Sequence, residues 1–351
     1  MPGKKSIKGT SGVSIRDVAE TAGVSLSSVS RVLNDSGYVS GGLRERVHEA
    51  IRQLNFHPNV FARGLRASQS KTIGLILRDV ANTTFATLWK AAFDSASEYG
   101  YNVLVISSEN SRAKEDACIQ LMLQQQVAGL AAFAADESNH AYEHLAERIP
   151  LVLVESEVNR LSVDRVVCGN YQGAYLAGRY LIERNHSRVV LLSGSQSRFP
   201  GRERRRGFEA AFEAAGLPVE PDLLFLESHL DTAGRARLIS TLLHKDRPTA
   251  IFAASSHLTL EALRVMRELE VAIPDDIAFV GFDNRDLAVL SSPSLTTVER
   301  DVYQLGARAI ELLIARIRNP EAMCRTVTIP TELVIRDSVG MRVRARSTPV
   351  V

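Results

Sequence analysis

Three short helical patterns occupy the N-terminal part of the chain. Apolar residues recur at i, i+3 and i+4 from Ile15, which predicts a first helix that ends near Thr21. Ser14 stands at its N-cap position, and Gly23 suits the left-handed conformation that ends many helices. The second and third helices are expected over residues 26–33 and 42–54.

Beyond Pro58 the pattern changes to short apolar runs separated by helical stretches. Nearly continuous apolar strands that alternate with helices are typical of parallel α/β sheets. The runs are too many for one typical sheet, so we expect two doubly wound subdomains. The strands are expected at residues 71–77, 101–107, 129–134, 150–156, 187–194, 249–255 and 276–282. The helices between them include Phe85–Tyr99, Asn170–Arg184 and His257–Leu269.

The first two helices and the glycine turn between them have the pattern of a helix-turn-helix. The second helix of that motif lies in the major groove of DNA, so its outer face is polar while its inner face packs on the first helix. The inner face is expected to hold Val29, Val32 and Leu33. The outer positions are Leu26, Ser27, Ser28, Ser30 and Arg31. An αα-hairpin without a role in DNA binding is the alternative.

The formal net charge of the 351-residue chain is only +2, but it is unevenly distributed. Residues 1–67 hold ten basic and five acidic residues, so this head carries +5 and the remainder carries −3. A small basic head on a mildly acidic body favours a polyanion as the partner of the head.

Composition argues against several other classes of protein. Hydrophobic residues make up 45% of the chain and charged residues 23%, which is ordinary for a globular protein. No apolar run approaches the length of a membrane span, and no secretory signal follows the basic N-terminus. We therefore expect a cytoplasmic protein that does not bind membranes. The three cysteines lie far apart, so neither a zinc knuckle nor a disulfide framework is expected.

The common sequence motifs of enzymes are missing. The chain has no P-loop, no nucleophile elbow and no HExxH motif. Its eight histidines are scattered, and we interpret them as surface residues. We therefore expect no enzymatic activity, no catalytic residue, no bound metal and no cofactor.

A series of sequence blocks extends from the head into the body. The blocks include SIRDVAETAGVSLSSVSRVLN, GYVSGGLRERVHEAIRQLNFHPNVFARGLR, LAGRYLIERNHSRVVLLSG, VAIPDDIAFVGFDN and SPSLTTVERDVYQLGARAIELL. In content and order they closely resemble the lactose-repressor (LacI) family of bacterial transcription factors, from residue 14 to about residue 338. The resemblance implies a helix-turn-helix head on a body like that of a periplasmic sugar-binding protein. In such a body, two α/β lobes joined by three crossings hold an effector between them.

The resemblance also implies how the head would read DNA. Leu26 and Ser27 would contact base edges, and an apolar side chain such as Leu26 suits the methyl group of thymine. Arg31 would contact a guanine edge or a phosphate. Contacts to the DNA backbone are expected from Ser14, Ser25, Ser28, Ser30, Asn34, Tyr38, Ser40 and Arg44.

Residues 59–65 resemble the hinge helix of the family, which orders on operator DNA. Leu65 would enter the minor groove as an apolar wedge that kinks the duplex. Asn59 and Ala62 would lie against the sugar–phosphate backbone. The alternative for Leu65 is a linker leucine that touches the core.

In the body, the resemblance places effector-binding roles on residues of both lobes. Phe85 belongs to the loop of the first lobe that meets the ligand, Arg204 matches the ligand-binding arginine, and Asp283 matches the acid of the second lobe. Phe85 has an alternative place in the lobe core, and Arg204 in a solvated basic face. The full set of effector-binding candidates is Thr84, Phe85, Glu155, Arg204, Ser256 and Asp283.

Two acidic positions of the family's sugar site are occupied here by Ser256 and Gly169. Because Arg204 is retained while these acids are replaced, the site should be less negative than usual. We therefore expect an effector with an anionic group, such as a sugar acid or a sugar phosphate, rather than a neutral sugar.

Two rival interpretations share parts of this pattern. A solute-binding protein would have the same body, but it would need an export signal and would lack the basic head. An architectural nucleoid protein would use the head without an effector, and its affinity for DNA would not respond to a ligand.

The expected protein is a homodimeric repressor of a carbohydrate or sugar-acid operon. Its two heads would bind the half-sites of a near-palindromic double-stranded operator, and an effector in the cleft would bias the hinge and so change operator affinity. The C-terminal segment has no leucine heptads, so a dimer is expected rather than a tetramer. The expected segments are a disordered basic tail (1–13), the DNA-binding domain (14–58), the hinge and linker (59–70), the effector-binding and dimerisation domain (71–338, with crossings near 169, 295 and 330) and a C-terminal tail (339–351).

Overall fold

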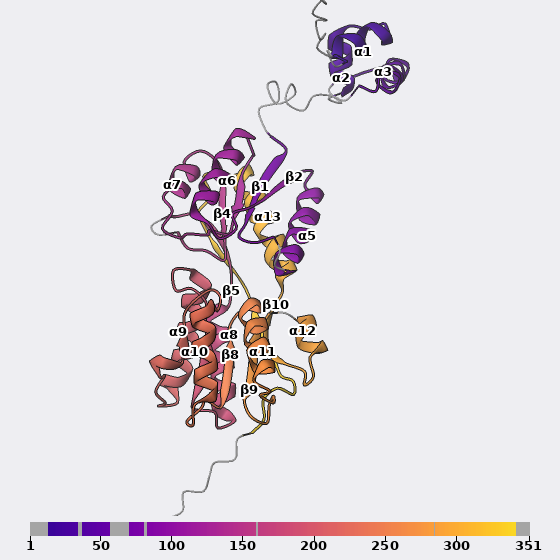
Figure 1. Cartoon of the computed structure of the whole chain (residues 1–351). Coiled ribbons are helices and arrows are strands. Elements are labelled where there is room, and N and C mark those ends of the chain that lie inside the picture. The colour runs from indigo at the N-terminus through magenta and orange to yellow at the C-terminus, as the bar shows by residue number, and fades with distance from the viewer. Residues whose placement is uncertain are drawn as a thin grey trace, which may run out of the picture. The chain divides into compact units, whose positions relative to one another are not determined.

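The structure is a computed structural model that describes residues 13–33, 37–56, 70–80, 83–158, 161–283 and 285–341. The chain divides into two compact units, Met1–Ser70 and Lys71–Val351, each with its own core (Figure 1). In the described ranges, no helix is both long and apolar enough to cross a membrane.

The first unit contains three helices, α1 (Ile15–Ala22), α2 (Leu26–Leu33) and α3 (Gly41–Gln53). The start of α1 is a capping box. The backbone N–H of Ser14 donates to the Asp17 carboxylate at 2.7 Å, and the Ser14 hydroxyl accepts from the Asp17 N–H at 3.4 Å. The predicted helices are confirmed, although α3 begins and ends one residue earlier than expected.

A small apolar core holds the three helices together. Gly23, at φ 62°, ends α1 in the left-handed conformation and lets the chain turn into α2. The side chains that pack in the core include Val18, Val29, Val32, Val47 and Ala50. Val29 and Val32 of α2 pack in this core and Leu33 packs against it, whereas Leu26, Ser27 and Arg31 are exposed.

The second unit consists of two lobes, each built on a six-stranded sheet. Every strand pair of the first sheet is parallel, in the order β11-β5-β4-β3-β1-β2. Its strands are β1 (Thr72–Leu77), β2 (Asn102–Ser107), β3 (Leu130–Ala132), β4 (Leu151–Val154), β5 (Asp164–Cys168) and β11 (Thr326–Ile329). Its helices are α5 (Thr83–Glu98), α6 (Arg112–Gln124), α7 (Ala141–Ala146) and α13 (Val302–Arg318).

The second sheet has the order β12-β10-β9-β8-β6-β7 and is parallel except for the antiparallel pairing of β12 with β10. Its strands are β6 (Val189–Leu192), β7 (Leu224–Phe225), β8 (Ala250–Ala253), β9 (Ala278–Phe282), β10 (Thr296–Arg300) and β12 (Thr331–Val334). Its helices are α8 (Asn170–Glu183), α9 (Phe199–Ala214), α10 (Thr232–Leu243), α11 (Ser256–Glu268), α12 (Arg285–Leu290) and a 3-10 turn at Pro221–Leu223.

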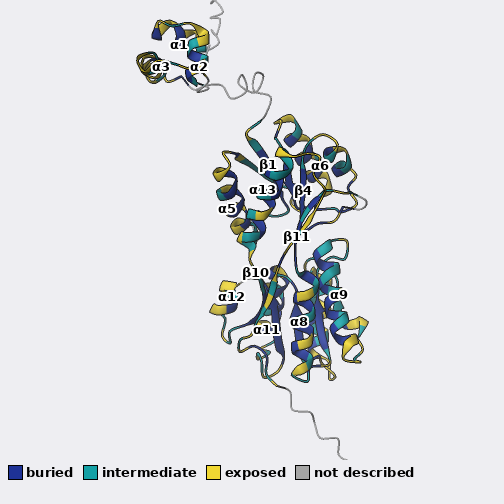
Figure 2. Cartoon of the chain, turned by 180° about the vertical axis from the view of Figure 1, so that it is seen from behind, coloured by how far each residue is buried: buried dark blue, intermediate teal, exposed yellow. Residues whose placement is uncertain are grey.

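Helices cover both faces of each sheet, as the nearly continuous apolar strands predicted. In the first lobe, α5 and α13 pack on one face, and α6 and α7 on the other. In the second lobe, α8 and α9 share one face, while α10, α11 and α12 share the other. Figure 2 shows the resulting distribution, with strands buried and the outer helix surfaces exposed.

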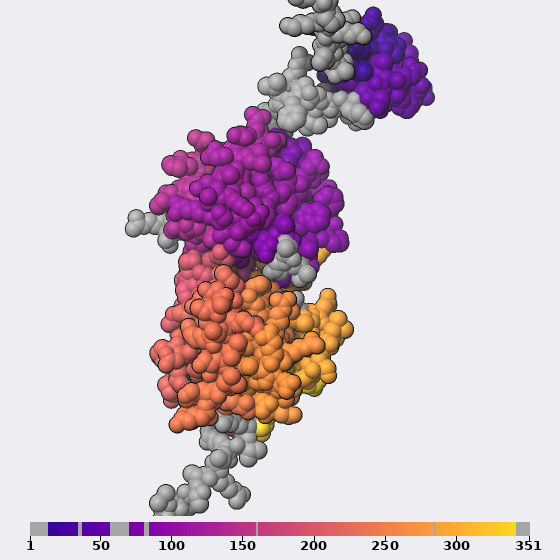
Figure 3. Space-filling model, in the orientation of Figure 1, coloured from indigo at the N-terminus to yellow at the C-terminus, as the bar shows by residue number. Residues whose placement is uncertain are grey.

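The chain passes between the two sheets at three places. The first passage follows β5 at Gly169, and the third lies at Pro330 between β11 and β12. The second lies at Asp301 rather than near residue 295, because residues 296–300 still form β10 of the second sheet. The strands that border these passages, β5, β10, β11 and β12, therefore form the hinge between the lobes. Figure 3 shows the two lobes as masses that narrow where they meet.

Candidate functional site

Helix α2 presents a polar face to solvent. Its buried positions are Val29 and Val32, so the residues on the other side of the helix are accessible. Leu26 is 44% exposed, and both Ser27 and Arg31 are exposed. A leucine beside serine and arginine suits the major groove, which presents thymine methyl groups as well as polar base edges.

Serine hydroxyls cluster at the start of α2. The hydroxyl of Ser25 lies 2.8 Å from that of Ser27 and 2.9 Å from that of Ser28, and it accepts from the Ser28 N–H at 3.2 Å. Ser25 therefore caps the helix. The N-terminus of a helix attracts anions, and hydroxyls beside it can contact phosphate oxygens. This end of α2 is thus suited to a DNA phosphate.

The remaining head residues that were proposed to contact DNA lie near helix ends. Ser14 precedes α1, and its hydroxyl contacts the Asp17 carboxylate at 2.8 Å. Tyr38 is 94% exposed, and Ser40 precedes α3 without donating or accepting a side-chain cap hydrogen bond. Ser28, Ser30 and Arg44 are half-buried. Four further candidates lie outside the described residues, namely Asn34, Asn59, Ala62 and Leu65.

A cleft of about 680 Å³ lies between the two lobes of the second unit. The first lobe contributes the carboxyl end of β1 and the start of α5. The second lobe contributes the carboxyl ends of β6 and β8 and the N-terminal turns of α9 and α11. Ligands of parallel α/β folds bind outside the carboxyl ends of the strands, and this cleft has that position on both sheets.

The cleft brings together three of the six effector-binding candidates, Phe85, Arg204 and Ser256. Phe85 also packs edge-on against Phe133, with ring centroids 5.2 Å apart, so it serves the lobe core as well. Ser256 is the buried first residue of α11.

Arg204 reaches the cleft from α9, but protein groups already hold most of its guanidinium. Its Nε donates to Asn170 Oδ1 at 2.8 Å, and Nη1 donates to the backbone oxygen of Ala254. Its Nη2 lies 4.0 Å from Glu155, and the guanidinium stacks 3.8 Å from the Phe282 ring centroid. Burial lowers the pKa of Arg204 to about 10, and the nearby positive charge of Arg300 contributes to the shift. Arg204 is buried, so the alternative that it belongs to a solvated basic face is wrong.

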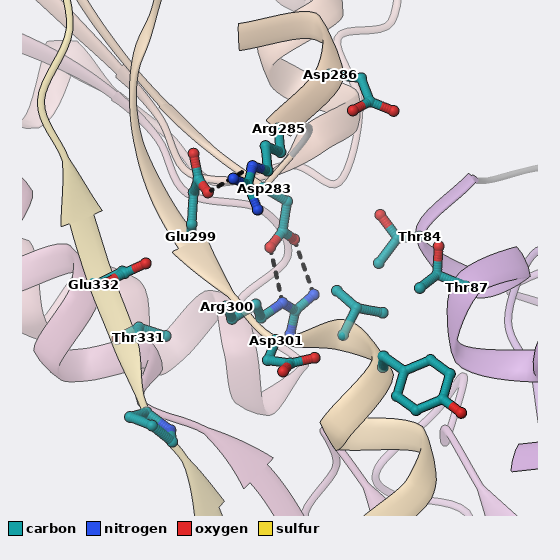
Figure 4. Close-up of a pocket in the computed structure, with 13 residues that line it drawn as sticks. Thr84, Thr87, Asp283, Arg285, Asp286, Glu299, Arg300, Asp301, Thr331 and Glu332 are labelled. Carbon is teal, nitrogen blue, oxygen red and sulfur yellow. Dashed lines mark hydrogen bonds and ion pairs between the residues drawn. The ribbon is translucent and has the colours of Figure 1, made fainter. Parts of the chain in front are cut away.

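The other three candidates are not in the cleft. Thr84 and Asp283 line a second cavity, of about 660 Å³, on the hinge strands, and Figure 4 shows their side chains there. Glu155 lines neither cavity. Acidic side chains also line this second cavity, namely Asp286, Glu299, Asp301 and Glu332.

Asp283 and Glu155 are instead engaged by Arg300, a residue that sequence analysis did not select. Arg300 donates to both carboxylate oxygens of Asp283 at 2.9 Å and to Glu155 Oε2 at 2.6 Å. Burial alone would raise the pKa of Glu155, but Arg300 and Arg204 outweigh it and hold that pKa below its ordinary value of 4.5. One buried arginine thus joins a carboxylate from each lobe at the hinge.

Arg78 and Arg198 line the cleft from opposite lobes and were not among the residues expected from the sequence. Arg78 follows β1 directly and Arg198 precedes α9. Both positions could have been recognised in the sequence, because one follows an expected strand and the other precedes a helix. In the described ranges, no group of His, Cys, Asp and Glu side chains could hold a metal ion.

Comparison with known proteins connects both parts of the chain to one kind of protein. Residues 14–59 match the family described as bacterial regulatory proteins, lacI family, and residues 179–339 match a periplasmic binding protein-like domain. The HTH-type transcriptional regulator DegA of Bacillus subtilis is 32% identical over 336 residues, which is 93% of this chain and 98% of that protein.

Two further matches have the same extent. The ribose operon repressor of Haemophilus influenzae is 30% identical over 93% of this chain and 98% of that protein. Among solved structures, the lac repressor dimer bound to operator and the anti-inducer ONPF matches with a TM-score of 0.81. Its sequence is 25% identical, over 93% of this chain and 99% of that one.

Proposed function

Because the chain belongs to the lacI family of bacterial regulatory proteins, it is a DNA-binding transcriptional regulator, and we propose that it represses a carbohydrate or sugar-acid operon under the control of an effector in the interlobe cleft. It binds double-stranded operator DNA and a small-molecule effector, and it forms dimers. The single observation that carries the effector role is the cleft at the carboxyl ends of both sheets.

We infer that α2 is the recognition helix. Leu26, Ser27 and Arg31 lie on its exposed face and would contact base edges. The serines around its N-terminus would hold a phosphate and so fix the register of the helix on the duplex. In this proposal the wedge role of Leu65, with Asn59 and Ala62 on the DNA backbone, remains a prediction.

For the effector we propose that Phe85, Arg204 and Ser256 contact the ligand directly. Glu155 and Asp283 would act through Arg300, because their carboxylates are already bound to it. A ligand that draws the lobes together would shift the hinge strands against one another, and a coupling of about 1–3 kcal/mol is typical of such linkage. The relatives named above are transcriptional regulators, and we infer a regulator that acts in the cytoplasm without enzymatic activity.

The test is a selection of the full-length protein against a library of double-stranded DNA with a randomised core. We expect enrichment of a near-palindrome with two half-sites, because a dimer presents two equivalent α2 helices. The same selection with Arg31→Ala should relax the preference at one position in each half-site. Binding without an enriched sequence would contradict the proposal and favour an architectural protein.

A further inference from the structure

The interlobe cleft is lined by an excess of basic side chains. Arg78, Arg198 and Arg204 all line it, and His229 and His257 add two further nitrogen-bearing rings. Among the described lining residues, Asp79 is the only carboxylate. The cleft is therefore electropositive, and the first turn of α11 adds the positive end of a helix dipole at Ser256.

Arg204 does not account for this excess, because it is held within the protein. Asn170, the backbone oxygen of Ala254 and the ring of Phe282 surround its guanidinium, and Glu155 lies at 4.0 Å. Its charge is thus already balanced in part.

Arg78 is different, since in the described parts of the chain no carboxylate lies within 4.0 Å of its guanidinium. Its guanidinium stands over the Phe133 ring at 5.8 Å. Burial and the positive charge of Arg198 across the cleft lower the pKa of Arg78 to about 10, while Glu155 and Glu137 act in the opposite direction. Arg78 is half-buried, and a cation that is partly removed from water without a paired anion is unfavourable.

Arg198 is the second incompletely paired cation. Its Nε donates a long hydrogen bond of 3.4 Å to the Ala135 backbone oxygen, and burial lowers its pKa. The neighbouring acids are engaged elsewhere. Glu137 pairs with Arg202 at 2.8 Å, and Asp136 pairs with Arg112 at 3.2 Å.

The two cations belong to opposite lobes, Arg78 to the first and Arg198 to the second. Their mutual repulsion therefore acts across the hinge. Any group that neutralises both would remove the repulsion and add hydrogen bonds from two lobes to one ligand. Guanidinium groups suit this role because their planar donor pairs match the oxygens of phosphate and carboxylate.

We propose that Arg78 and Arg198 form an anion subsite in which a phosphate or carboxylate group of the effector binds both lobes and closes the cleft. This inference rests on the proposed role of the cleft as the effector site. It adds two specificity-determining residues and assigns lobe closure to the anionic part of the ligand, so a neutral sugar lacks the group that closes the protein.

The test is the thermal stability of the full-length protein, measured for the wild type, Arg78→Gln, Arg198→Gln and the control Arg179→Gln. Arg179 is an exposed arginine on α8 that pairs with Glu183. The probes are inorganic phosphate, glucose, gluconate and glucose 6-phosphate, each compared with potassium chloride at equal ionic strength.

We expect phosphate and at least one anionic sugar to raise the Tm of the wild type and of Arg179→Gln beyond the effect of chloride. Arg78→Gln and Arg198→Gln should lose this shift, with affinity for the anion at least about tenfold weaker. Without ligand, both cleft variants should melt at or above the Tm of the wild type, because each removes a half-buried cation that is incompletely paired. A merely structural role of either arginine would instead lower the Tm.

Three results would overturn the proposal. These are no phosphate-dependent shift in the wild type, an equal shift in all four proteins, or a shift produced by glucose alone. The last result would leave the cleft as an effector site and remove only its anion subsite. Operator binding, measured in parallel by fluorescence anisotropy, separates these cases from a failure of the proposed function, in which no variant binds DNA specifically.

Discussion

At the scale of single residues, Arg300 is the most constrained side chain of the hinge. Its side chain is 9% exposed, and it binds Asp283 and Glu155 from different lobes. Buried carboxylates are costly without a counter-charge, so the hinge depends on this one guanidinium. The same contacts keep both carboxylates away from a ligand in the cleft.

We expect Arg300→Met to lower the free energy of unfolding by about 3–5 kcal/mol at pH 7, because buried Asp283 loses its counter-charge and buried Glu155 keeps only the more distant Arg204. Urea denaturation measures this loss. The control is Arg308→Met, which breaks an exposed pair with Glu311 on α13 and should change stability by no more than about 1 kcal/mol.

The loss should also depend on pH. The pKa of Glu155 is lowered in the folded protein, so its contribution is present above its ordinary pKa of 4.5 and disappears as the pH falls through the folded value. In Arg300→Met, the loss of this counter-charge should raise the pKa of Glu155. Protonation of Glu155 at lower pH would then remove the cost of burying its negative charge. The difference between the two proteins should therefore narrow between pH 7 and pH 4. A constant difference would contradict the role of Glu155.

The sequence located part of this residue-scale chemistry. Phe85, Arg204 and Ser256 could be placed at the effector site because they fall on sequence blocks that resemble those of the lacI family, and all three line the cleft. The pairing of Asp283 with Arg300 could not be predicted, because it depends on how β9 and β10 lie in register. In the sequence, Arg78 and Arg198 cannot be told from ordinary solvated arginines. Only the folded structure shows that they line the same cleft from opposite lobes.

At the scale of elements, the close packing of α8 on α9 positions the basic side of the cleft. Gly207 of α9 lies against the backbone of Tyr171 in α8, and a β-carbon there would overlap the Tyr171 carbonyl oxygen. Gly178 of α8 is less crowded, because a β-carbon there would lie 3.0 Å from the β-carbon of Ala211 in α9. Since α9 carries Arg204 and follows Arg198, this packing sets where both arginines reach the cleft.

Gly207→Ala should destabilise the protein by about 1–3 kcal/mol, because the two helices must move apart to admit the methyl group. It should also weaken anion binding without any change in charge. The comparison variant is Gly234→Ala on α10, where the nearest atom to an added β-carbon is a side-chain oxygen of Asp231 at 3.3 Å. Thermal melts of both variants would settle the point, and equal melting temperatures would speak against the packing argument.

The elements that the sequence identified are those with continuous apolar runs. The strands β1, β2, β3, β4, β6, β8 and β9 could be predicted for this reason. The hinge strands β10 and β12 were missed because residues such as Glu299 and Glu332 alternate with apolar ones, which is typical of strands near a sheet edge. The remaining missed strands are β5, β7 and β11.

At the scale of the whole molecule, the second unit has an apolar surface suited to a dimer. Trp89 and Phe93 of α5 are 48% and 52% exposed, and Val289 and Leu290 of α12 are 55% and 83% exposed. Figures 1 and 2 show α5 and α12 on the same side of this unit. Exposed apolar residues on two neighbouring lobes are expected of an interface that both lobes share.

Trp89→Lys should convert the dimer to a monomer at micromolar concentration, because it places a charge on this apolar surface. Sedimentation equilibrium measures the mass directly. Operator affinity should fall with it, since a monomer binds one half-site. Leu243→Lys is the matched control, because Leu243 is a similarly exposed leucine at the end of α10. A dimeric Trp89→Lys protein would show that the interface lies elsewhere.

The division into a basic head and a two-lobed body could be read from charge and periodicity alone. The sequence could not show which residues the two lobes bring face to face, because such contacts join segments more than a hundred residues apart. Arg78 and Arg198 are an example, and so are Glu155 and Arg300.

The most direct test of this account is operator affinity with and without an effector. Fluorescence anisotropy would follow the full-length protein on its selected operator while the anionic sugar with the largest thermal shift is added. We expect the dissociation constant to change by a factor of about 5–150, which is the usual size of coupling between two sites. An unchanged dissociation constant, with the ligand demonstrably bound in the cleft, would contradict an effector-controlled regulator.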